Sequence, residues 1–128
     1  MKILMADVDD RYLSKVAFDR LHTKNTLSFV ADGVELINDL KSRLDSKEDL
    51  PDLILLDINM PRKNGLEALK EIIEDEKLKH LRVILFTTSQ LEKDKTDVMR
   101  IGADGLMVKP ANLNGLIEVF RKICEQPL

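Results

Sequence analysis

The chain of 128 residues lacks the features that mark disulfide-bonded, membrane-spanning and nucleic-acid-binding proteins. Its single cysteine, Cys124, cannot form a disulfide within the chain, and its apolar neighbours predict a side chain that faces the core. No apolar run approaches the ~18 residues of a membrane helix, and no signal peptide is visible. Lysine and arginine number 20 against 23 acidic residues, so the basic excess typical of nucleic-acid binding is absent. We therefore expect a cytoplasmic protein with no membrane or nucleic-acid partner.

Short apolar runs alternate with longer amphipathic stretches along the whole chain. Runs of the length of buried strands lie at residues 3–6, 27–30, 53–56, 83–86 and 106–108. Most are continuously apolar, as strands buried on both faces of a parallel sheet should be. Ser28 interrupts the second run and predicts an edge strand there. The length of the chain, and the lack of a repeat or linker, predict a single domain over residues 1–128.

Helical periodicity fills the intervals between these runs. Apolar residues recur at helical spacing within 13–21, 34–44, 66–73, 90–102 and 116–123. The fourth helix should be the least firmly anchored, because polar residues at 92–97 leave mainly Val98 and Ile101 to bury. A capping box is indicated at Asp32, and Gly102 is typical of a helix stop. The alternation predicts an α/β fold, (βα)5, with a doubly wound parallel five-stranded sheet and right-handed crossovers.

Residues that can carry chemistry follow four of the predicted strands, where the loops of a doubly wound sheet build the site. The first strand runs into Asp7, the third ends at Asp57, the fourth at Thr87 and the fifth at Lys109. A charge directly after a strongly apolar run is costly unless it has a partner or a function. Asp57 and Lys109 both meet that description, so they are the strongest candidates for a functional site.

These residue types at one edge of a sheet suit the movement of a phosphoryl group. A carboxylate can act as the nucleophile and form an acyl phosphate. Clustered carboxylates attract a hard divalent cation, which neutralises the nucleophile and the incoming phosphoryl oxygens. A lysine can hold one phosphoryl oxygen by its charge, and a hydroxyl can donate to another. Acidic residues after a strand can also be helix N-caps, which is the competing interpretation for Asp9 and Asp10.

Together these segments resemble the receiver domains of bacterial response regulators. The phosphoacceptor region corresponds to 51–61 and 64–67, the fourth strand with its switch hydroxyl to 83–89, and the fifth strand to 102–110. The resemblance covers essentially the whole chain in the right order, and residues 60–65 also resemble stand-alone receivers found beside phytochrome-type sensor kinases. It implies the flavodoxin-like strand order 2-1-3-4-5 and a function in two-component signal transduction.

The resemblance also implies a role for each candidate residue. Asp57 accepts a phosphoryl group from a sensor histidine kinase or a histidine phosphotransfer protein, and Thr87 and Lys109 bind the phosphoryl oxygens. Mg²⁺ is held by Asp57, the backbone carbonyl of Asn59 and an acidic residue such as Asp7. The peptide bond between Lys109 and its following proline is expected to be cis.

Family behaviour sets further expectations for a receiver. It is not an enzyme acting on a separate substrate, yet it takes phosphoryl groups from small donors and hydrolyses its own acyl phosphate. The output surface comprises the helix at 90–101, the fifth strand and the last helix, and acts on a downstream protein target. A homodimer through the last helix is compatible with Arg121 and Lys122 beside its apolar stripe.

Two positions depart from the family pattern. Val8 stands where most receivers place a second acidic metal ligand, and Asp9, one residue further on, is the candidate replacement. Leu106 stands where many receivers have an aromatic residue that is coupled to the switch hydroxyl. Neither departure changes the predicted fold; the two bear on the strength of phosphorylation and on the form of the switch.

Other functions share parts of this pattern. A pseudo-receiver has the same fold, is never phosphorylated and acts as a protein-binding module; Val8 supports it. A haloacid-dehalogenase-type phosphatase matches the first strand followed by Asp7-Val8-Asp9, but a later acidic metal motif is missing and Asp57 is left unexplained. A flavodoxin-like cofactor binder needs a hydroxyl- and glycine-rich phosphate loop after the first strand, where this chain has acids.

Overall fold

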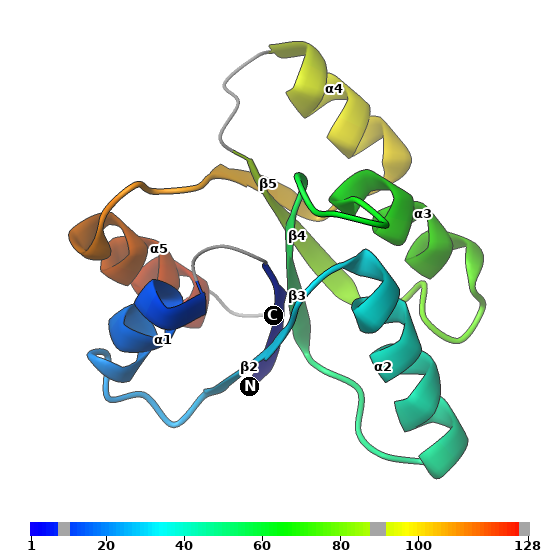
Figure 1. Ribbon diagram of the computed structural model, residues 1–128, viewed down its shortest axis with the longest axis horizontal. Helices are drawn as coiled ribbons and strands as arrows, with labels where there is room; N and C mark the ends of the chain where they lie inside the picture. Colours follow the sequence, from blue (N-terminus) through cyan, green and yellow to red (C-terminus); the bar gives the residue numbers. More distant parts are fainter. Residues whose placement is uncertain (8–10, 88–91, 126–128) are drawn as a thin grey trace.

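The computed structural model describes residues 1–7, 11–87 and 92–125 of the chain (Figure 1). The predictions for Val8, Asp9 and Asp10, and for a helix that starts at Gln90, lie outside these residues. No helix within the described ranges is both long enough and apolar enough to cross a bilayer.

The strands form one parallel sheet, and each contains a predicted apolar run. They are β1 (Lys2–Ala6), β2 (Thr26–Val30), β3 (Leu53–Asp57), β4 (Arg82–Thr87) and β5 (Gly105–Val108). Their order in the sheet is β2-β1-β3-β4-β5, which is the order that the resemblance implied. The prediction that residues 27–30 form an edge strand is confirmed, and β3 lies at the centre of the sheet.

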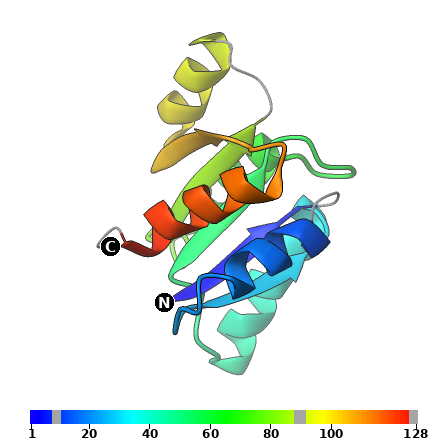
Figure 2. The ribbon, with the colours of Figure 1, turned by 90° about the vertical axis from the view of Figure 1, so that its left-hand side faces the viewer.

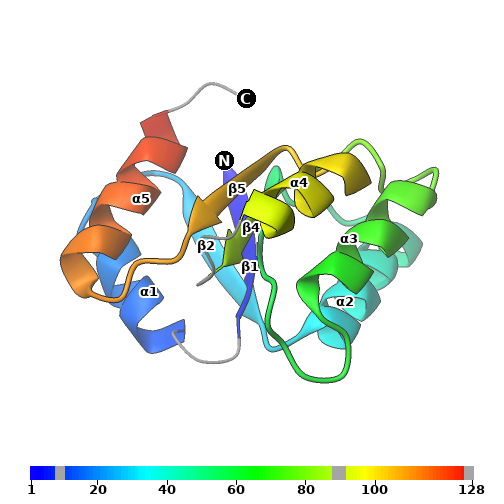
Figure 3. The same ribbon diagram turned by 90° about the horizontal axis from the view of Figure 1, so that it is seen from above.

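Helices cover both faces of this sheet. They are α1 (Arg11–Asp19), α2 (Gly33–Ser46), α3 (Gly65–Glu74), α4 (Glu92–Ile101) and α5 (Leu113–Glu125). Figures 1 and 3 show α1 and α5 on one face and α2, α3 and α4 on the other. The predicted doubly wound (βα)5 architecture is therefore confirmed.

Two separate apolar cores lie between the sheet and these helices. Successive side chains of a strand point to opposite faces. In β3, Ile54 and Leu56 therefore pack beneath α2, α3 and α4, whereas Leu53 and Leu55 pack beneath α1 and α5. All four side chains are at most 2% exposed, so the central strand is fixed from both sides. This fixes the position of Asp57, the last residue of the same strand.

The helices α1 and α5 lie side by side over the second core, as Figure 2 shows. Phe18 of α1 and Phe120 of α5 meet edge to face, with ring centroids 5.7 Å apart. Cys124 is half-buried and packs against the same core, which confirms the orientation that its neighbours predicted.

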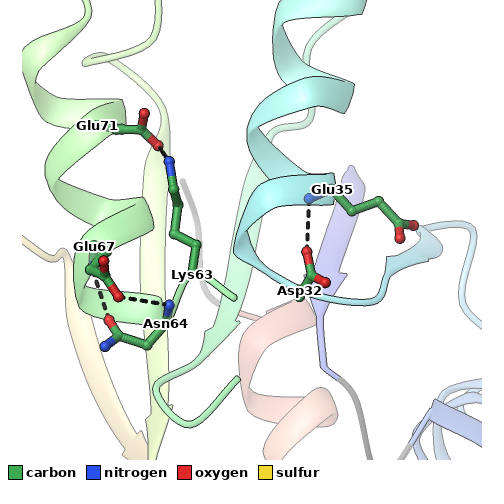
Figure 4. A network of polar contacts seen from close by, with 6 residues as sticks. All are labelled: Asp32, Glu35, Lys63, Asn64, Glu67 and Glu71. Atoms are coloured by element: carbon green, nitrogen blue, oxygen red, sulfur yellow. Dashed lines mark hydrogen bonds and ion pairs between the residues drawn. The ribbon is translucent and has the colours of Figure 1, made fainter. Parts of the chain in front are cut away.

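Side-chain caps define where several helices start and stop. Asp32 accepts a hydrogen bond from the Glu35 N–H at the start of α2, so the first half of the predicted capping box forms there. A complete capping box forms instead at α3, between Asn64 and Glu67 (Figure 4). Gly102 ends α4 with a φ of +119°, a conformation that glycine adopts without a Cβ clash.

The helix α4 has the shallow anchoring that its polar sequence predicted. Of the α4 side chains that the structure describes, Val98 is buried, Ile101 is half-buried and Met99 is 51% exposed. Few buried apolar contacts lower the free energy needed to move an element. An element with this anchoring can take a second position more readily than α3, whose apolar stripe is buried.

Candidate functional site

The candidate residues meet at the carboxyl edge of the sheet. Asp7 follows β1 directly, Asp57 ends β3, Thr87 ends β4 and Lys109 follows β5. The strand register pairs Asp57 with Phe86, so Thr87 stands one residue further along the neighbouring strand. The prediction that separate strands deliver these residues to one edge is confirmed.

All four side chains lie in the interior, although each is polar or charged. Asp7, Asp57, Thr87 and Lys109 are 0%, 5%, 2% and 9% exposed. Burial of a charge is unfavourable unless a partner compensates for the lost hydration. The arrangement of their partners therefore decides what the site can do.

One ammonium group lies between two carboxylates at this edge. Lys109 Nζ is 2.7 Å from Asp7 Oδ2 and 3.1 Å from Asp57 Oδ2. When both carboxylates are ionised, the three groups carry one net negative charge. A buried site with this balance gains from any further positive charge that reaches it.

The pKa of the Asp57 carboxyl is shifted upward, first of all by burial. Burial raises the pKa of the Asp57 carboxyl above its ordinary value of 3.8. The Asn59 N–H and the Lys109 ammonium act in the opposite direction, while the negative charge of Asp7 adds to the upward shift. A cation beside the carboxylate would favour its ionised and nucleophilic form.

The loop after β3 is folded tightly around the Asp57 carboxylate. Asn59 donates its N–H to Asp57 Oδ1 at 3.0 Å, so each carboxylate oxygen of Asp57 has a different partner. Gly65 begins α3 close to the strand end, and a Cβ there would be 2.6 Å from the Asp57 carbonyl oxygen. Glycine is required at that position because the backbone of α3 approaches the backbone of β3 so closely.

The ends of β4 and β5 are joined beside the charged groups. The Lys109 N–H donates to the Thr87 carbonyl oxygen at 2.8 Å. The expected cis bond between Lys109 and Pro110 is wrong, because the peptide bonds of the described residues are all trans. Even before proline the trans form is favoured by about 0.5–1 kcal/mol. Lys109 Nζ nevertheless reaches both carboxylates with the trans bond.

The available donors fit a hard divalent cation. Asp7 and Asp57 offer carboxylate oxygens, and Asn59, an exposed residue two positions after Asp57, has a backbone carbonyl that can supply a third oxygen. No third His, Cys, Asp or Glu side chain joins these two acids in the part of the chain that the structure describes. Mg²⁺ prefers oxygen ligands and usually keeps several waters, so a set of two carboxylates and one carbonyl suits it.

The sequence did not predict one ion pair near this site. Arg62, in the loop after β3, contacts Asp32 at the start of α2, with 2.7 Å between Nη2 and Oδ2. The two residues are 30 positions apart, and no periodicity or motif connects them. Their contact depends on the path of the loop, which only the folded structure reveals.

The fold and the site together define a doubly wound α/β domain in which a lysine lies between two buried aspartates at the carboxyl edge of the sheet. The family described as the response regulator receiver domain matches residues 6–121. The chain belongs to this family, and its function is that of a receiver in two-component signal transduction.

Individual relatives agree with this assignment. The chain is 34% identical to the transcriptional regulatory protein CpxR of Escherichia coli (strain K12) over 122 residues, which cover 95% of this chain and 48% of CpxR. The chain thus spans about half the length of CpxR. The phosphorylated cyanobacterial phytochrome response regulator RcpA is 31% identical with a TM-score of 0.86, and the match covers 97% of this chain and 91% of RcpA. The Mn²⁺-bound response regulator Rcp1 is 28% identical with a TM-score of 0.78, over 95% and 90% of the two chains.

Proposed function

We propose that Asp57 accepts a phosphoryl group from a phosphohistidine on a sensor histidine kinase or a histidine phosphotransfer protein. The observation that carries this proposal is the Lys109 ammonium, which lies between the Asp7 and Asp57 carboxylates in a buried site. A structural ion pair needs one acid for one base, whereas this site holds an extra carboxylate. The extra negative charge is what a cation-assisted phosphoacceptor requires.

Each residue has a defined part in the transfer. A carboxylate oxygen of Asp57 attacks the phosphorus atom, the P–N bond to the donor imidazole breaks, and its electron pair returns to the imidazole nitrogen. Lys109 and the Thr87 hydroxyl stabilise the equatorial phosphoryl oxygens. Mg²⁺, held by Asp7, Asp57 and the Asn59 carbonyl, with Asp9 as a further candidate ligand, supplies neutralising charge when it is bound.

The conformational response starts from the added charge. A phosphoryl group on Asp57 brings about −1.5 to −2 charges and three acceptor oxygens into the site. We assign the Thr87 hydroxyl and the Lys109 ammonium as the donors to this charge; Thr87 then moves toward it, and β4 and α4 repack. The shallow anchoring of α4 supports this step, because Val98 alone is buried among its described side chains. The surface of α4, β5 and α5 then acts on a downstream protein target.

Further properties follow from the same proposal. The protein takes phosphoryl groups from small donors and hydrolyses its own acyl phosphate, which ends the signal. It works in the cytoplasm as a single receiver domain over residues 1–128, either as a monomer or as a homodimer through α5. The similar response regulators RcpA, in phosphorylated form, and Rcp1, in Mn²⁺-bound form, support phosphorylation and divalent-cation binding here.

A pseudo-receiver is the alternative function, and Val8 is the observation that favours it. A site short of one acidic ligand binds hard cations less tightly, because affinity depends on the charge of the ligands. In that case the domain acts as a protein-binding module without phosphorylation. A test for phosphorylation of Asp57 therefore distinguishes the receiver from the pseudo-receiver.

Intact-mass spectrometry after incubation with acetyl phosphate tests the proposal directly. The wild type should gain one phosphoryl group only when Mg²⁺ is present, and Asp57→Asn should gain none. Asp45→Asn serves as the matched control, because Asp45 is an exposed aspartate on α2. If the wild type gains no mass even at high Mg²⁺, the pseudo-receiver is the better description, and Val8→Asp should then restore the gain.

A further inference from the structure

The loop between β3 and α3 carries a proposed metal ligand and is anchored at both of its ends. At the start, Ile58 donates its N–H to the Phe86 carbonyl at 3.0 Å. At the end, Gly65 donates its N–H to the Ile58 carbonyl, also at 3.0 Å. Asn59, whose carbonyl is the proposed ligand, lies inside this closed loop. The position of Asn59 therefore depends on how the tip of the loop is held.

The tip is held against the start of α2 by two kinds of contact. Arg62 approaches Asp32 Oδ2 with two nitrogens, Nε at 2.8 Å and Nη2 at 2.7 Å. The Gly33 N–H donates to the Lys63 carbonyl at 3.1 Å, and a Cβ on Gly33 would lie 2.4 Å from that oxygen. Lys63 also pairs with Glu71 of α3, as Figure 4 shows. The tip is thus joined to two helices by charged side chains.

The Asp32 side chain contacts both the start of α2 and the loop between β3 and α3. Its side chain is 7% exposed, and one oxygen accepts the Glu35 N–H at 2.9 Å while the other accepts from Arg62 (Figure 4 shows the contact with Glu35). A buried carboxylate that lost Arg62 would keep its helix cap but lose its counter-ion. A neutral asparagine would retain the cap alone, because asparagine is an equally good N-cap residue.

The backbone at the tip of the loop has a conformation that needs support from surrounding contacts. Arg62 has a φ of +64°, in the left-handed region. For a residue with a Cβ this conformation is unfavourable. Such a conformation persists only where surrounding contacts determine it. The contacts around it here are the ion pair with Asp32, the hydrogen bond from the Gly33 N–H to the Lys63 carbonyl, and a local hydrogen bond from the Lys63 N–H to the Pro61 carbonyl at 2.7 Å.

We propose that the Asp32–Arg62 pair is a positioning device that sets the affinity of the Asp57 site for Mg²⁺ by fixing the loop that carries the Asn59 carbonyl. This inference rests on the proposed function and names a control of its metal site. Mg²⁺ demands near-ideal octahedral geometry at about 2.0–2.1 Å, so it is sensitive to small shifts of one ligand. Arg62 stands three residues from Asn59 and acts through the backbone, without contact with the metal or the phosphoryl group.

Two variants remove the charge pair while they leave other contacts in place. Asp32→Asn keeps the α2 cap, and Arg62→Gln changes an arginine whose side chain is 59% exposed. Direct partners of metal ligands are worth about 10- to 100-fold in metal affinity. Since Arg62 acts one step further away, we expect each variant to weaken Mg²⁺ binding by about 3- to 10-fold. Arg62→Lys, which keeps the charge without the two-nitrogen fork, should fall between these variants and the wild type.

The experiment measures Mg²⁺ binding alone by NMR chemical-shift titration, and then the rate of phosphorylation by acetyl phosphate against Mg²⁺ concentration. We expect the half-saturating Mg²⁺ concentration to rise in both assays while the rate at saturating Mg²⁺ stays near that of the wild type. The control is Arg43→Gln, which breaks the Asp39–Arg43 pair on the same helix and should leave Mg²⁺ affinity unchanged. A merely structural role of Asp32 and Arg62 would lower the unfolding temperature without moving the half-saturating concentration.

The outcomes separate this inference from the function on which it rests. If the wild type binds Mg²⁺ and is phosphorylated but both variants have its half-saturating concentration, the positioning role is wrong and the function stands. If the wild type neither binds Mg²⁺ nor gains a phosphoryl group, both are wrong. Arg62→Gln alone decides the matter if Asp32→Asn fails to fold, because Arg62 is largely exposed.

Discussion

Replacing Asp57 with asparagine should make the unphosphorylated protein more stable at neutral pH. Asp57 is 5% exposed, and its carboxylate shares the Lys109 ammonium with Asp7. Burial raises the pKa of Asp57 in the folded state above its ordinary value of 3.8. An acid shifted in this direction stabilises the fold below its unfolded pKa, and this stabilisation is lost as the pH rises through the folded pKa. At pH 7 the ionised carboxylate is therefore a cost to folding.

The distances around Lys109 give the size of the effect. The two carboxylate oxygens lie 2.7 and 3.1 Å from the same nitrogen, so they are at most 5.8 Å apart. At an effective dielectric constant of about 20, Lys109 attracts Asp57 by about 5 kcal/mol and Asp7 repels it by about 3 kcal/mol or more. Burial of an ionised carboxylate costs several kcal/mol, which exceeds the difference. Asparagine keeps the shape of the side chain, so we expect a gain of about 1–2 kcal/mol in the free energy of unfolding.

Urea unfolding of the wild type and Asp57→Asn at pH 7 and near pH 4 measures this gain. The variant should unfold at higher urea at pH 7, and the difference should shrink toward pH 4 as Asp57 of the wild type becomes protonated. Asp45→Asn, on the exposed side of α2, should change stability by no more than about 0.5 kcal/mol. An Asp57→Asn variant less stable than the wild type at pH 7 would show that the attraction to Lys109 outweighs burial, and would refute the reasoning.

Three other changes test separate parts of the structure. Lys109→Met leaves Asp7 and Asp57 buried without their shared cation and should lower stability at pH 7 by about 3 kcal/mol or more, measured by urea unfolding; unchanged stability would mean that the buried acids do not need this cation for the fold. The pKa of Asp32 is lowered, first by the Glu35 N–H and further by Arg62, so its stabilisation exists above pH 3.8 and is lost as the pH falls through the folded pKa. An NMR titration of Asp32 that gave a pKa of 3.8 or higher would contradict this. Gly65→Ala places a Cβ 2.6 Å from a backbone oxygen and should destabilise the protein by about 1–3 kcal/mol in thermal unfolding; a neutral result would show that α3 can move away from β3.

The sequence predicted those parts of the site that depend on strand ends. Asp57 and Lys109 each follow an apolar run, and parallel strands bring their carboxyl ends to one edge. The sharing of Lys109 between two acids was not predicted. It depends on how far the Lys109 side chain extends from the end of β5 toward the ends of β3 and β1. The contact between Arg62 and Asp32 was not predicted either, because it requires a left-handed residue at a loop tip.

The helix caps also show that contacts between neighbouring residues can be predicted from the sequence, whereas contacts between distant residues cannot. The α3 cap lies within four residues, and its Asn-x-x-Glu pattern is a purely local signal, because asparagine is a favoured N-cap residue. At α2 the sequence indicated a reciprocal capping box, but Asp32 instead divides its oxygens between Glu35 and the distant Arg62. The local pattern therefore predicted the contact of Asp32 with the Glu35 N–H but not its contact with Arg62.

The stability and the chemistry of this site have one common cause. The core beneath β1 and β3 forces Asp7 and Asp57 out of water, and a single Lys109 cannot neutralise both of them. A second lysine, or an asparagine at position 57, would remove the imbalance and make a more stable but unreactive domain. In the proposed function, the uncompensated charge favours a bound cation, and the cation would in turn favour the ionised carboxylate that attacks phosphorus. The strain at Arg62 fits the same logic, because a relaxed loop would leave the third oxygen of the cation site without a fixed position.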